Sequence, residues 1–251
     1  MTVRRVPIAG QTRENFTVNE RSTGRQHRFV LPGPQLSVEE QIQCLTQLQW
    51  ASVAADYVVA SGSLPCGVAP NFYQRVADLC CRARHLRHRH RPPVLGGGLL
   101  KTSAEELGAR ASRQLPTQSE RVDAARQLID DGVAETVLVT MGRVGAVLVT
   151  AAAAHYQPAL TSTANGGVGA GDGMLAAVTV GLARCLPLER AVQLGAAAAA
   201  VLLTPGTAMC QSSAIYHLLT HMPDPVGATD DPDVYAFVRS YIPAPQSAAL
   251  G

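Results

Sequence analysis

One run of small residues, Gly169-Ala170-Gly171-Asp172, constrains the fold of this chain more than any other feature. The apolar segment 174–183 follows it almost at once and predicts a helix. Glycines that open a helix allow close backbone approach, and the free N–H groups and helix dipole there favour an anion. A carboxylate beside an anion site is well placed to take a proton from a hydroxyl that attacks phosphorus. The run therefore indicates phosphoryl transfer onto an alcohol.

Two other interpretations of the same run stay open on the residues alone. Most Gly-x-Gly-x-Gly runs are ordinary turns, and Asp172 then only balances the helix dipole. A dinucleotide-binding loop is a weaker alternative, because the spacing is not Gly-x-Gly-x-x-Gly and no clear strand leads into the run.

Composition favours a compact soluble protein of one domain, with at most a small appendage. The 251 residues are 47% hydrophobic and 16% charged, and the net charge of +2 favours neither nucleic acid nor membrane as a partner. No apolar run is long enough to span a membrane, and the N-terminus lacks a signal peptide's apolar core. The six cysteines form no Cys-x-x-Cys pair, which is typical of free thiols. We expect a cytoplasmic protein.

The basic residues are unevenly distributed. Lys101 is the single lysine, so any role that needs a lysine falls on it. Five arginines and three histidines crowd into residues 82–91, where strand–helix alternation predicts a strand. This run is either a polyanion-binding patch or a solvated loop, and its lack of interleaved aromatic residues favours the loop.

Periodicity and turn residues predict an α/β protein. The expected elements are a hairpin at 13–32, strands at 57–60, 136–140 and 146–150, and helices at 37–50, 71–82, 117–131, 169–183 and 188–203. Capping boxes begin at Ser37, Ser103 and Thr117. The apolar strands predict a parallel sheet covered on both faces, with ligands at the carboxyl ends of its strands. Because Ser63, Lys101, Gly142 and Asp172 follow strands or start helices, we expect them to converge on one cleft.

Several motifs in order resemble the PfkB branch of the ribokinase-like sugar kinases, and within it the phosphofructokinase and hexose-phosphate kinase group. The resemblance covers residues 8–217. It rests on Gly10-Gln11-Thr12-Arg13-Glu14-Asn15, Arg28-Phe29-Val30-Leu31-Pro32-Gly33, Ser61-Gly62-Ser63-Leu64-Pro65, Lys101, Val139-Thr140-Met141-Gly142, Gly169-Ala170-Gly171-Asp172 and Thr204-Pro205-Gly206-Thr207. The Gly-Ala-Gly-Asp run is the signature of that family.

The resemblance implies a ribokinase-like three-layer α/β/α sandwich with a partial β-lid and without the family's N-terminal strands. Residues 1–34 correspond to the lid segment, 35–222 to the kinase core, and 223–251 to a tail of unknown role. The chain is expected to lack about the first quarter of a typical member. In the family the lid covers the sugar site and often pairs two subunits, so a homodimer through the hairpin is expected.

The resemblance also assigns a role to each site residue, with ATP and Mg²⁺ as cofactors. Asp172 corresponds to the catalytic base, which also contacts the sugar, and the N–H groups of Gly169, Ala170 and Gly171 to the anion hole. Arg13 and Ser63 correspond to contacts with the sugar phosphate. Glu106 corresponds to the glutamate that orders magnesium through water. The nucleotide side comprises Lys101, Ser103, Glu106, Thr140, Gly142 and Gly206.

Taken singly, these residues have ordinary structural interpretations too. Arg13 is compatible with a charge at a hairpin edge, and Ser63 with a turn cap. Lys101 and Glu106 are compatible with a solvated pair at a helix start.

Departures from the family pattern predict weakened catalysis. Lys101-Thr102-Ser103 stands where the family has Lys-Pro-Asn, and Gly166-Gly167 replaces a Ser-Thr pair. The basic run 82–91 replaces a strand and its Asp-x-Ser-Gly turn. A misplaced substrate costs orders of magnitude in rate, so we expect this chain to turn over weakly or not at all.

The function expected from the resemblance is ATP-dependent phosphorylation of a sugar phosphate, of the type that converts fructose 6-phosphate to fructose 1,6-bisphosphate in glycolysis. The alternatives are a 1-phosphofructokinase or tagatose-6-phosphate kinase, an inactive nucleotide-binding or dimerisation module, and a polyanion binder that uses residues 82–91.

Overall fold

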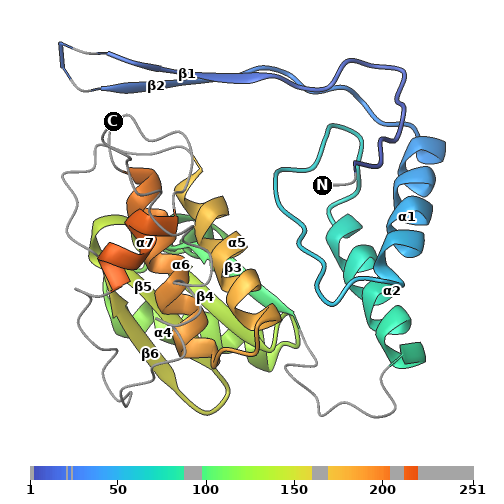
Figure 1. Cartoon of the computed structure of the whole chain (residues 1–251). Coiled ribbons are helices and arrows are strands. Elements are labelled where there is room, and N and C mark those ends of the chain that lie inside the picture. Colours follow the sequence, from blue (N-terminus) through green and yellow to red (C-terminus); the bar gives the residue numbers. More distant parts are fainter. Residues whose placement is uncertain are drawn as a thin grey trace, which may run out of the picture. The chain divides into compact units, whose positions relative to one another are not determined.

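The chain forms two units, Met1–Val94 (unit 1) and Leu95–Gly251 (unit 2). The computed structural model describes residues 3–20, 22–23, 25–87, 98–159, 169–203 and 212–219 (Figure 1). The division into lid, core and tail at residues 34 and 222 stays a prediction.

Unit 1 begins with the predicted hairpin. Strands β1 (Asn15–Asn19) and β2 (Gln26–Val30) pair antiparallel, with Phe16 opposite Phe29. The two rings stack with their centroids 4.7 Å apart. Because side chains alternate across a strand, Phe16, Val18 and Phe29 lie on one face of this two-stranded sheet.

Two helices follow the hairpin in unit 1. Helix α1 (Val38–Ser52) begins with the predicted capping box, in which Ser37 and Glu40 bond each other's backbone N–H groups. Helix α2 (Phe72–Arg87) runs five residues beyond its predicted end at Arg82. The first part of the basic run is therefore helical, not a loop or a strand, because Arg, Ala and Leu are good helix formers. Residues 88–91 lie outside the described residues.

The predicted strand at Tyr57–Ala60 is absent, and this prediction was wrong. Among the described residues of unit 1, strands β1 and β2 pair only with each other. A short apolar segment forms a strand only where a neighbour supplies ladder hydrogen bonds. Without that neighbour the segment stays irregular, with Val58 and Val59 exposed.

Unit 2 contains a four-stranded sheet in the order β3-β4-β5-β6. Its strands are β3 (Leu99–Ser103), β4 (Thr136–Thr140), β5 (Gly145–Thr150) and β6 (Ala154–Pro158). The prediction of a parallel sheet was wrong in part. Strands β3 and β4 are parallel, whereas β4–β5 and β5–β6 are antiparallel. Helices separate β3 from β4, but only a tight turn around the 3₁₀ helix η1 (Gly142–Val144) joins β4 to β5, which forces the chain to reverse.

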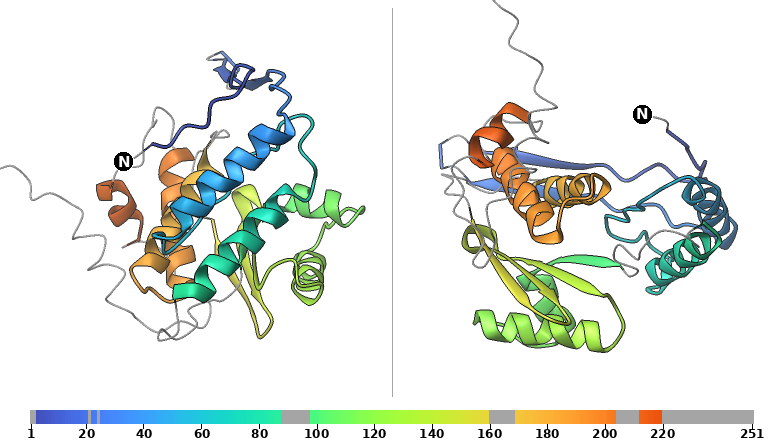
Figure 2. Two further views of the ribbon diagram at one scale, coloured as in Figure 1. Left: turned by 90° about the vertical axis from the view of Figure 1, so that its right-hand side faces the viewer. Right: turned by 60° about the horizontal axis from the view of Figure 1, so that its bottom comes forward.

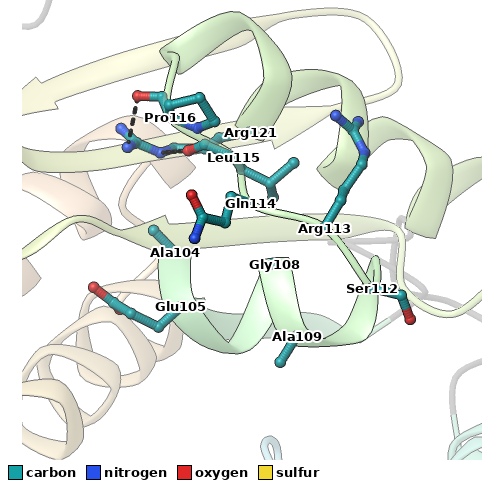
Figure 3. Close-up of a pocket in the computed structure, with 10 residues that line it drawn as sticks. All are labelled: Ala104, Glu105, Gly108, Ala109, Ser112, Arg113, Gln114, Leu115, Pro116 and Arg121. Atoms are coloured by element: carbon teal, nitrogen blue, oxygen red, sulfur yellow. Dashed lines mark hydrogen bonds between the residues drawn. The ribbon is translucent and has the colours of Figure 1, made fainter.

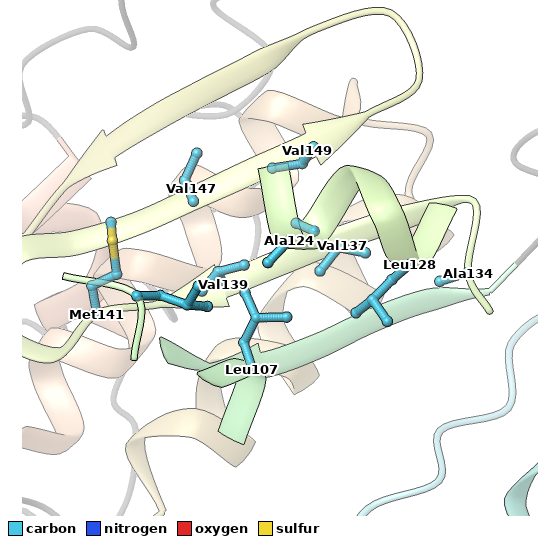
Figure 4. Packing of buried hydrophobic residues seen from close by; sticks show 11 residues of the cluster. Leu107, Ala124, Leu128, Ala134, Val137, Val139, Met141, Val147 and Val149 are labelled. Atoms are coloured by element: carbon cyan, nitrogen blue, oxygen red, sulfur yellow. The ribbon is translucent and has the colours of Figure 1, made fainter. Parts of the chain in front are cut away.

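Helices cover both faces of this sheet, as the right-hand view of Figure 2 shows for unit 2. One layer contains α3 (Ala104–Arg110) and α4 (Gln118–Asp130), and the other contains α5 (Ala170–Ala183), α6 (Leu188–Leu203) and α7 (Ser212–Leu219). Val137, Val139, Val147 and Val149 pack against α3 and α4 (Figure 4). The alternate residues Leu138 and Leu148 are buried on the other face, where α6 contacts β5 and β6. The three-layer α/β/α architecture is confirmed.

Helix α5 is held in place by close packing on α6. A Cβ at residue 173 would collide with the side chain of Leu202, and one at residue 195 would lie 2.6 Å from Val178 Cγ2. These glycines let the two helix backbones approach, so α6 fixes the direction in which the N-terminus of α5 points. Strands β3 and β6 and helix α7 were not predicted, because their apolar patterns are short. No helix in the described part of the chain is long and apolar enough to cross a membrane.

Candidate active site

The Gly-Ala-Gly-Asp run stands at the N-terminus of α5, as predicted. Gly169 is the N-cap, with a φ of 93° that favours glycine, and its carbonyl accepts the N–H of Gly173 at 2.8 Å. Glycine has no side chain that could cap the first turn of the helix. The backbone amides of this turn and the helix dipole therefore make an electropositive surface. Asp172 stands in this first turn and is exposed.

Lys101 lies directly against the first turn of α5. A side chain at position 171 would place its Cβ 2.6 Å from Lys101 Nζ, so the ammonium occupies the space that Gly171 leaves. Lys101 is in the middle of β3 rather than after a strand, and it is half-buried. The structure thus brings together two predicted site groups that are seventy residues apart in sequence and adds a full positive charge to the electropositive helix end.

Glu106 lies at the start of α3, near the same lysine. Its Oε2 accepts the Ser103 N–H at 2.7 Å and the Thr102 hydroxyl at 3.4 Å, while Ser103 Oγ accepts the Glu106 N–H at 3.1 Å. The pKa of Glu106 is lowered, first by the backbone hydrogen bond from Ser103 and further by the positive charge of Lys101. Glu106 is therefore an ionised carboxylate at neutral pH.

Thr140 and Gly142 extend this group along the neighbouring strand. Thr140 is the register partner of Ser103, and its hydroxyl donates to the Thr102 carbonyl at 3.3 Å. Gly142 follows in an exposed turn with a φ of 57°. Ser103, Glu106 and Thr140 thus gather at the carboxyl ends of two parallel strands, and Lys101 stands two residues before the end of β3. Thr102 is a member that sequence reasoning missed, although it stands between two predicted residues.

The remaining predicted residues lie elsewhere. Arg13 and Ser63, fifty residues apart, are both in unit 1, where Arg13 Nη2 donates to Ser63 Oγ at 2.6 Å. The structure therefore pairs the two predicted sugar-phosphate contacts with each other. Convergence of Ser63 with Lys101, Gly142 and Asp172 on one cleft stays a prediction. Gly206 lies outside the described residues.

A pocket of about 590 Å³ in unit 2 is distinct from this group. It lies between α3 and the start of α4 (Figure 3). Its lining residues are Ala104, Glu105, Gly108, Ala109, Ser112, Arg113, Gln114, Leu115, Pro116 and Arg121. None of the predicted site residues lines it. No cluster of three or more His, Cys, Asp or Glu side chains suited to hold a metal occurs among the described residues.

Comparison with known proteins identifies a family for this chain. The family model of the pfkB family carbohydrate kinases matches residues 2–214. The ATP-dependent 6-phosphofructokinase isozyme 2 of Mycobacterium tuberculosis is 47% identical over 243 residues, which are 92% of this chain and 70% of that protein. The 1-phosphofructokinase of Escherichia coli is 28% identical, with the same coverage of 92% and 70%.

Solved structures agree with this grouping. The tetrameric inhibited form of phosphofructokinase-2 from Escherichia coli superposes with a TM-score of 0.71 and 26% sequence identity, covering 86% of this chain and 72% of that one. The ribokinase-like fold, the signature run at the start of α5 and the family match across residues 2–214 agree with one another. The chain belongs to the pfkB family of carbohydrate kinases.

Proposed function

We propose that this chain transfers the γ-phosphoryl group of ATP to a hydroxyl of fructose 6-phosphate, giving fructose 1,6-bisphosphate. The observation that carries the proposal is the position of Lys101 Nζ against Gly171, at a helix N-terminus whose first turn contains Asp172. This arrangement concentrates positive charge where a phosphoryl group in transfer is negative and sets a carboxylate next to it.

In the proposed reaction, Asp172 accepts the proton of the attacking sugar hydroxyl. A bond forms between that oxygen and the γ-phosphorus, the bond from the γ-phosphorus to its bridging oxygen breaks, and ADP leaves. The amides of Gly169, Ala170 and Gly171 and the Lys101 ammonium stabilise the charge on the transferred group. Lys101, Ser103, Thr140 and Gly142 hold the nucleotide, and Gly206 is assigned to the same side by the family pattern.

Glu106 fits the role of a magnesium-ordering carboxylate. It is ionised, because the Ser103 N–H and Lys101 lower its pKa, and it stands beside the lysine expected to meet the phosphates. A single carboxylate that holds a hydrated ion through water is a usual arrangement for Mg²⁺ bound to nucleotide phosphates. When bound, the ion neutralises charge on the β- and γ-phosphates.

Arg13 and Ser63 are proposed to bind the phosphate that the sugar already carries. A guanidinium binds phosphate through two parallel N–H bonds, and the hydroxyl of Ser63 adds a third donor. The 2.6 Å bond from Arg13 Nη2 to Ser63 Oγ holds the two side chains next to each other in unit 1.

The sugar is proposed from the relatives. A 6-phosphofructokinase isozyme is 47% identical to this chain, whereas a 1-phosphofructokinase is 28% identical over the same share of it. Fructose 6-phosphate is therefore the first substrate to test, with fructose 1-phosphate and tagatose 6-phosphate as the alternatives. We further propose that the enzyme works in the cytoplasm, in the glycolytic direction.

We also propose that the hairpin joins two copies of the chain. Phe16, Val18 and Phe29 share one face and are about half exposed, at 50%, 48% and 47%. A two-stranded sheet with such a face gains stability by burying it, and the same face on a second copy is self-complementary under two-fold symmetry. Phe16→Asp should convert a dimer to a monomer in analytical ultracentrifugation, whereas Thr17→Asp, on the opposite face, should not.

Two measurements together test the proposed activity. Isothermal titration with ATP–Mg²⁺ measures nucleotide binding, and a coupled assay of ADP release with each of the three sugar phosphates measures turnover. Binding with turnover on fructose 6-phosphate supports the proposal. Binding without turnover on any sugar supports the alternative of a non-catalytic nucleotide module. Turnover at the rate of its relatives would contradict the weakening that we expect from the departures from the family pattern.

A further inference from the structure

Arg121 connects three backbone and side-chain groups that belong to different segments of unit 2. It lies in helix α4, and its guanidinium donates through Nε to the Leu115 carbonyl at 2.9 Å and through Nη2 to the Pro116 carbonyl at 3.0 Å (Figure 3). Its Nη1 donates to the sulfur of Met141 at 3.4 Å. One side chain thus ties the connection between α3 and α4 to the end of β4.

On the β4 side, the contact reaches the turn that contains Gly142. Met141 is buried, its N–H donates to the Gly145 carbonyl at 2.8 Å, and its own carbonyl accepts the Val144 N–H at 3.2 Å. The backbone of Met141 therefore closes both ends of this turn. A constraint on the Met141 side chain is a constraint on the position of Gly142.

On the other side, the contact reaches helix α3, which carries Glu106. The Arg113 carbonyl would lie 2.9 Å from a Cβ at residue 108, and the buried Leu115 side chain packs beside it. Gly108 is two residues beyond Glu106 in the same helix. The segment that Arg121 holds by its carbonyls is therefore the segment against which α3 is packed.

We propose that Arg121 is a positioning residue of the nucleotide site, which holds the Gly142 turn and helix α3 in a fixed relation without touching the nucleotide. This inference rests on the proposed function, in which Gly142 and Glu106 serve the nucleotide side. The planar fork of an arginine reaches three acceptors at once, which the single ammonium of a lysine does not reproduce. Removing it releases both segments together and leaves the sugar-phosphate pair Arg13–Ser63 unchanged.

The first test needs no ligand. In Arg121→Met, amide hydrogen exchange at Met141 and Val144 should become about tenfold faster, because a charged hydrogen bond that holds the turn is lost. Arg126→Met is the matched control, since Arg126 is an exposed arginine of the same helix. Unchanged exchange at Met141 and Val144 in Arg121→Met would overturn the inference, whatever the chain binds.

The second test separates nucleotide from sugar. Arg121→Met should raise the KM and Kd for ATP–Mg²⁺ by about tenfold and change the KM for fructose 6-phosphate by less than about twofold. A merely structural role would raise both KM values or lower only the yield of folded protein. Where Arg121→Met fails to fold, Arg121→Lys and Met141→Leu keep the test open and should show the same split in smaller measure. A wild-type chain that binds no ATP refutes the proposed function, whereas an equal rise in both KM values refutes this inference.

Discussion

The two units differ sharply in how well they bury their own apolar residues. In unit 2, Val137, Leu138, Val139 and Val147 are all 0% exposed, because helices cover both faces of the sheet. In unit 1, Leu45 is the single buried hydrophobic side chain among the described residues, and Trp50 is 70% exposed. The proposed nucleotide groups therefore belong to a unit with a well-buried hydrophobic core. The Arg13–Ser63 pair belongs to a unit whose apolar faces are largely exposed unless another surface covers them.

This difference suggests how the two ends of the reaction are controlled. Groups on a closely packed core are held in fixed geometry, which favours stabilisation of a transition state. Side chains of a sparsely packed unit change position when another surface covers that unit. Such a change would alter how tightly the sugar phosphate binds. Substitutions in unit 2 should therefore act on nucleotide binding, on the chemical step and on folding, and those in unit 1 on binding of the sugar phosphate.

The largest effect is expected at Asp172. Asp172→Asn removes the proposed base without changing size, so kcat should fall by about 10²–10⁴-fold, while the affinity for fructose 6-phosphate, proposed to depend mainly on the Arg13–Ser63 pair, should change far less. Single-turnover kinetics and titration of the sugar phosphate would measure the two quantities. Asp123→Asn, an exposed position of α4, is the control. An Asp172→Asn variant with wild-type kcat would refute the proposed base.

A core substitution tests the contrast in packing directly. Leu138→Ala should lower the free energy of unfolding by about 2–5 kcal/mol, because it leaves a cavity inside a fully buried sheet. Phe16→Ala in the exposed hairpin face should lower it by less than about 1 kcal/mol in dilute protein, where pairing of copies is weak. Urea denaturation of both variants gives the comparison. Equal losses would show that the hairpin face is covered in solution.

Arg13→Ala should act on substrate capture alone. Loss of a charged hydrogen bond worth about 1.5–3 kcal/mol corresponds to a rise of about 10–100-fold in the KM for the sugar phosphate. The KM for ATP should stay the same, since the proposed nucleotide groups belong to unit 2. Arg28→Ala, from the neighbouring strand of the hairpin, serves as the control. An equal rise in the KM for ATP and the KM for the sugar phosphate would contradict the assignment of sugar-phosphate binding to unit 1 and nucleotide binding to unit 2.

The smallest expected effect is on the acid side of the stability profile. The pKa of Glu106 in the folded chain lies below its ordinary value of 4.5. Its contribution to stability is therefore present above about pH 4.5 and is lost as the pH falls through the lowered folded pKa. Glu106→Gln should flatten the decrease of the unfolding free energy in that acid range, as measured by urea denaturation at several pH values. An unchanged dependence of the unfolding free energy on pH would mean that the charge of Glu106 does not strengthen its hydrogen bond with the Ser103 N–H.

Local signals in the sequence predicted local structure well. The capping boxes at Ser37, Ser103 and Thr117 all form, because each needs only residues three apart. The strand at Tyr57–Ala60 failed because a strand needs a neighbour that periodicity does not reveal. Strand β3 was missed because two leucines alone carry no clear alternation, although this strand holds Lys101.

The site was predictable to a different degree at each of its parts. The signature run at Gly169–Asp172 is contiguous, so its own residues were enough to predict that it starts a helix, whereas its catalytic role stays a prediction. The contact of Lys101 with Gly171 and the bond of Arg13 to Ser63 join distant segments, and the resemblance to a family assigned these residues where spacing alone did not. The hydrogen bonds of Arg121 could not be predicted from the sequence. An arginine on a helix is common, and its acceptors here are two backbone carbonyls and a methionine sulfur.

The bond from the Ser103 N–H to Glu106 has a practical consequence, because one carboxylate oxygen serves both the start of α3 and the proposed site. Any ligand that draws charge from Glu106 weakens the acceptor of that amide proton. The ¹H–¹⁵N resonance of Ser103 would then shift in proportion to occupancy, even with no substrate turned over. The amide resonance of Ser103, the N-cap of α3, thus reports the fraction of the neighbouring site that is occupied by ligand.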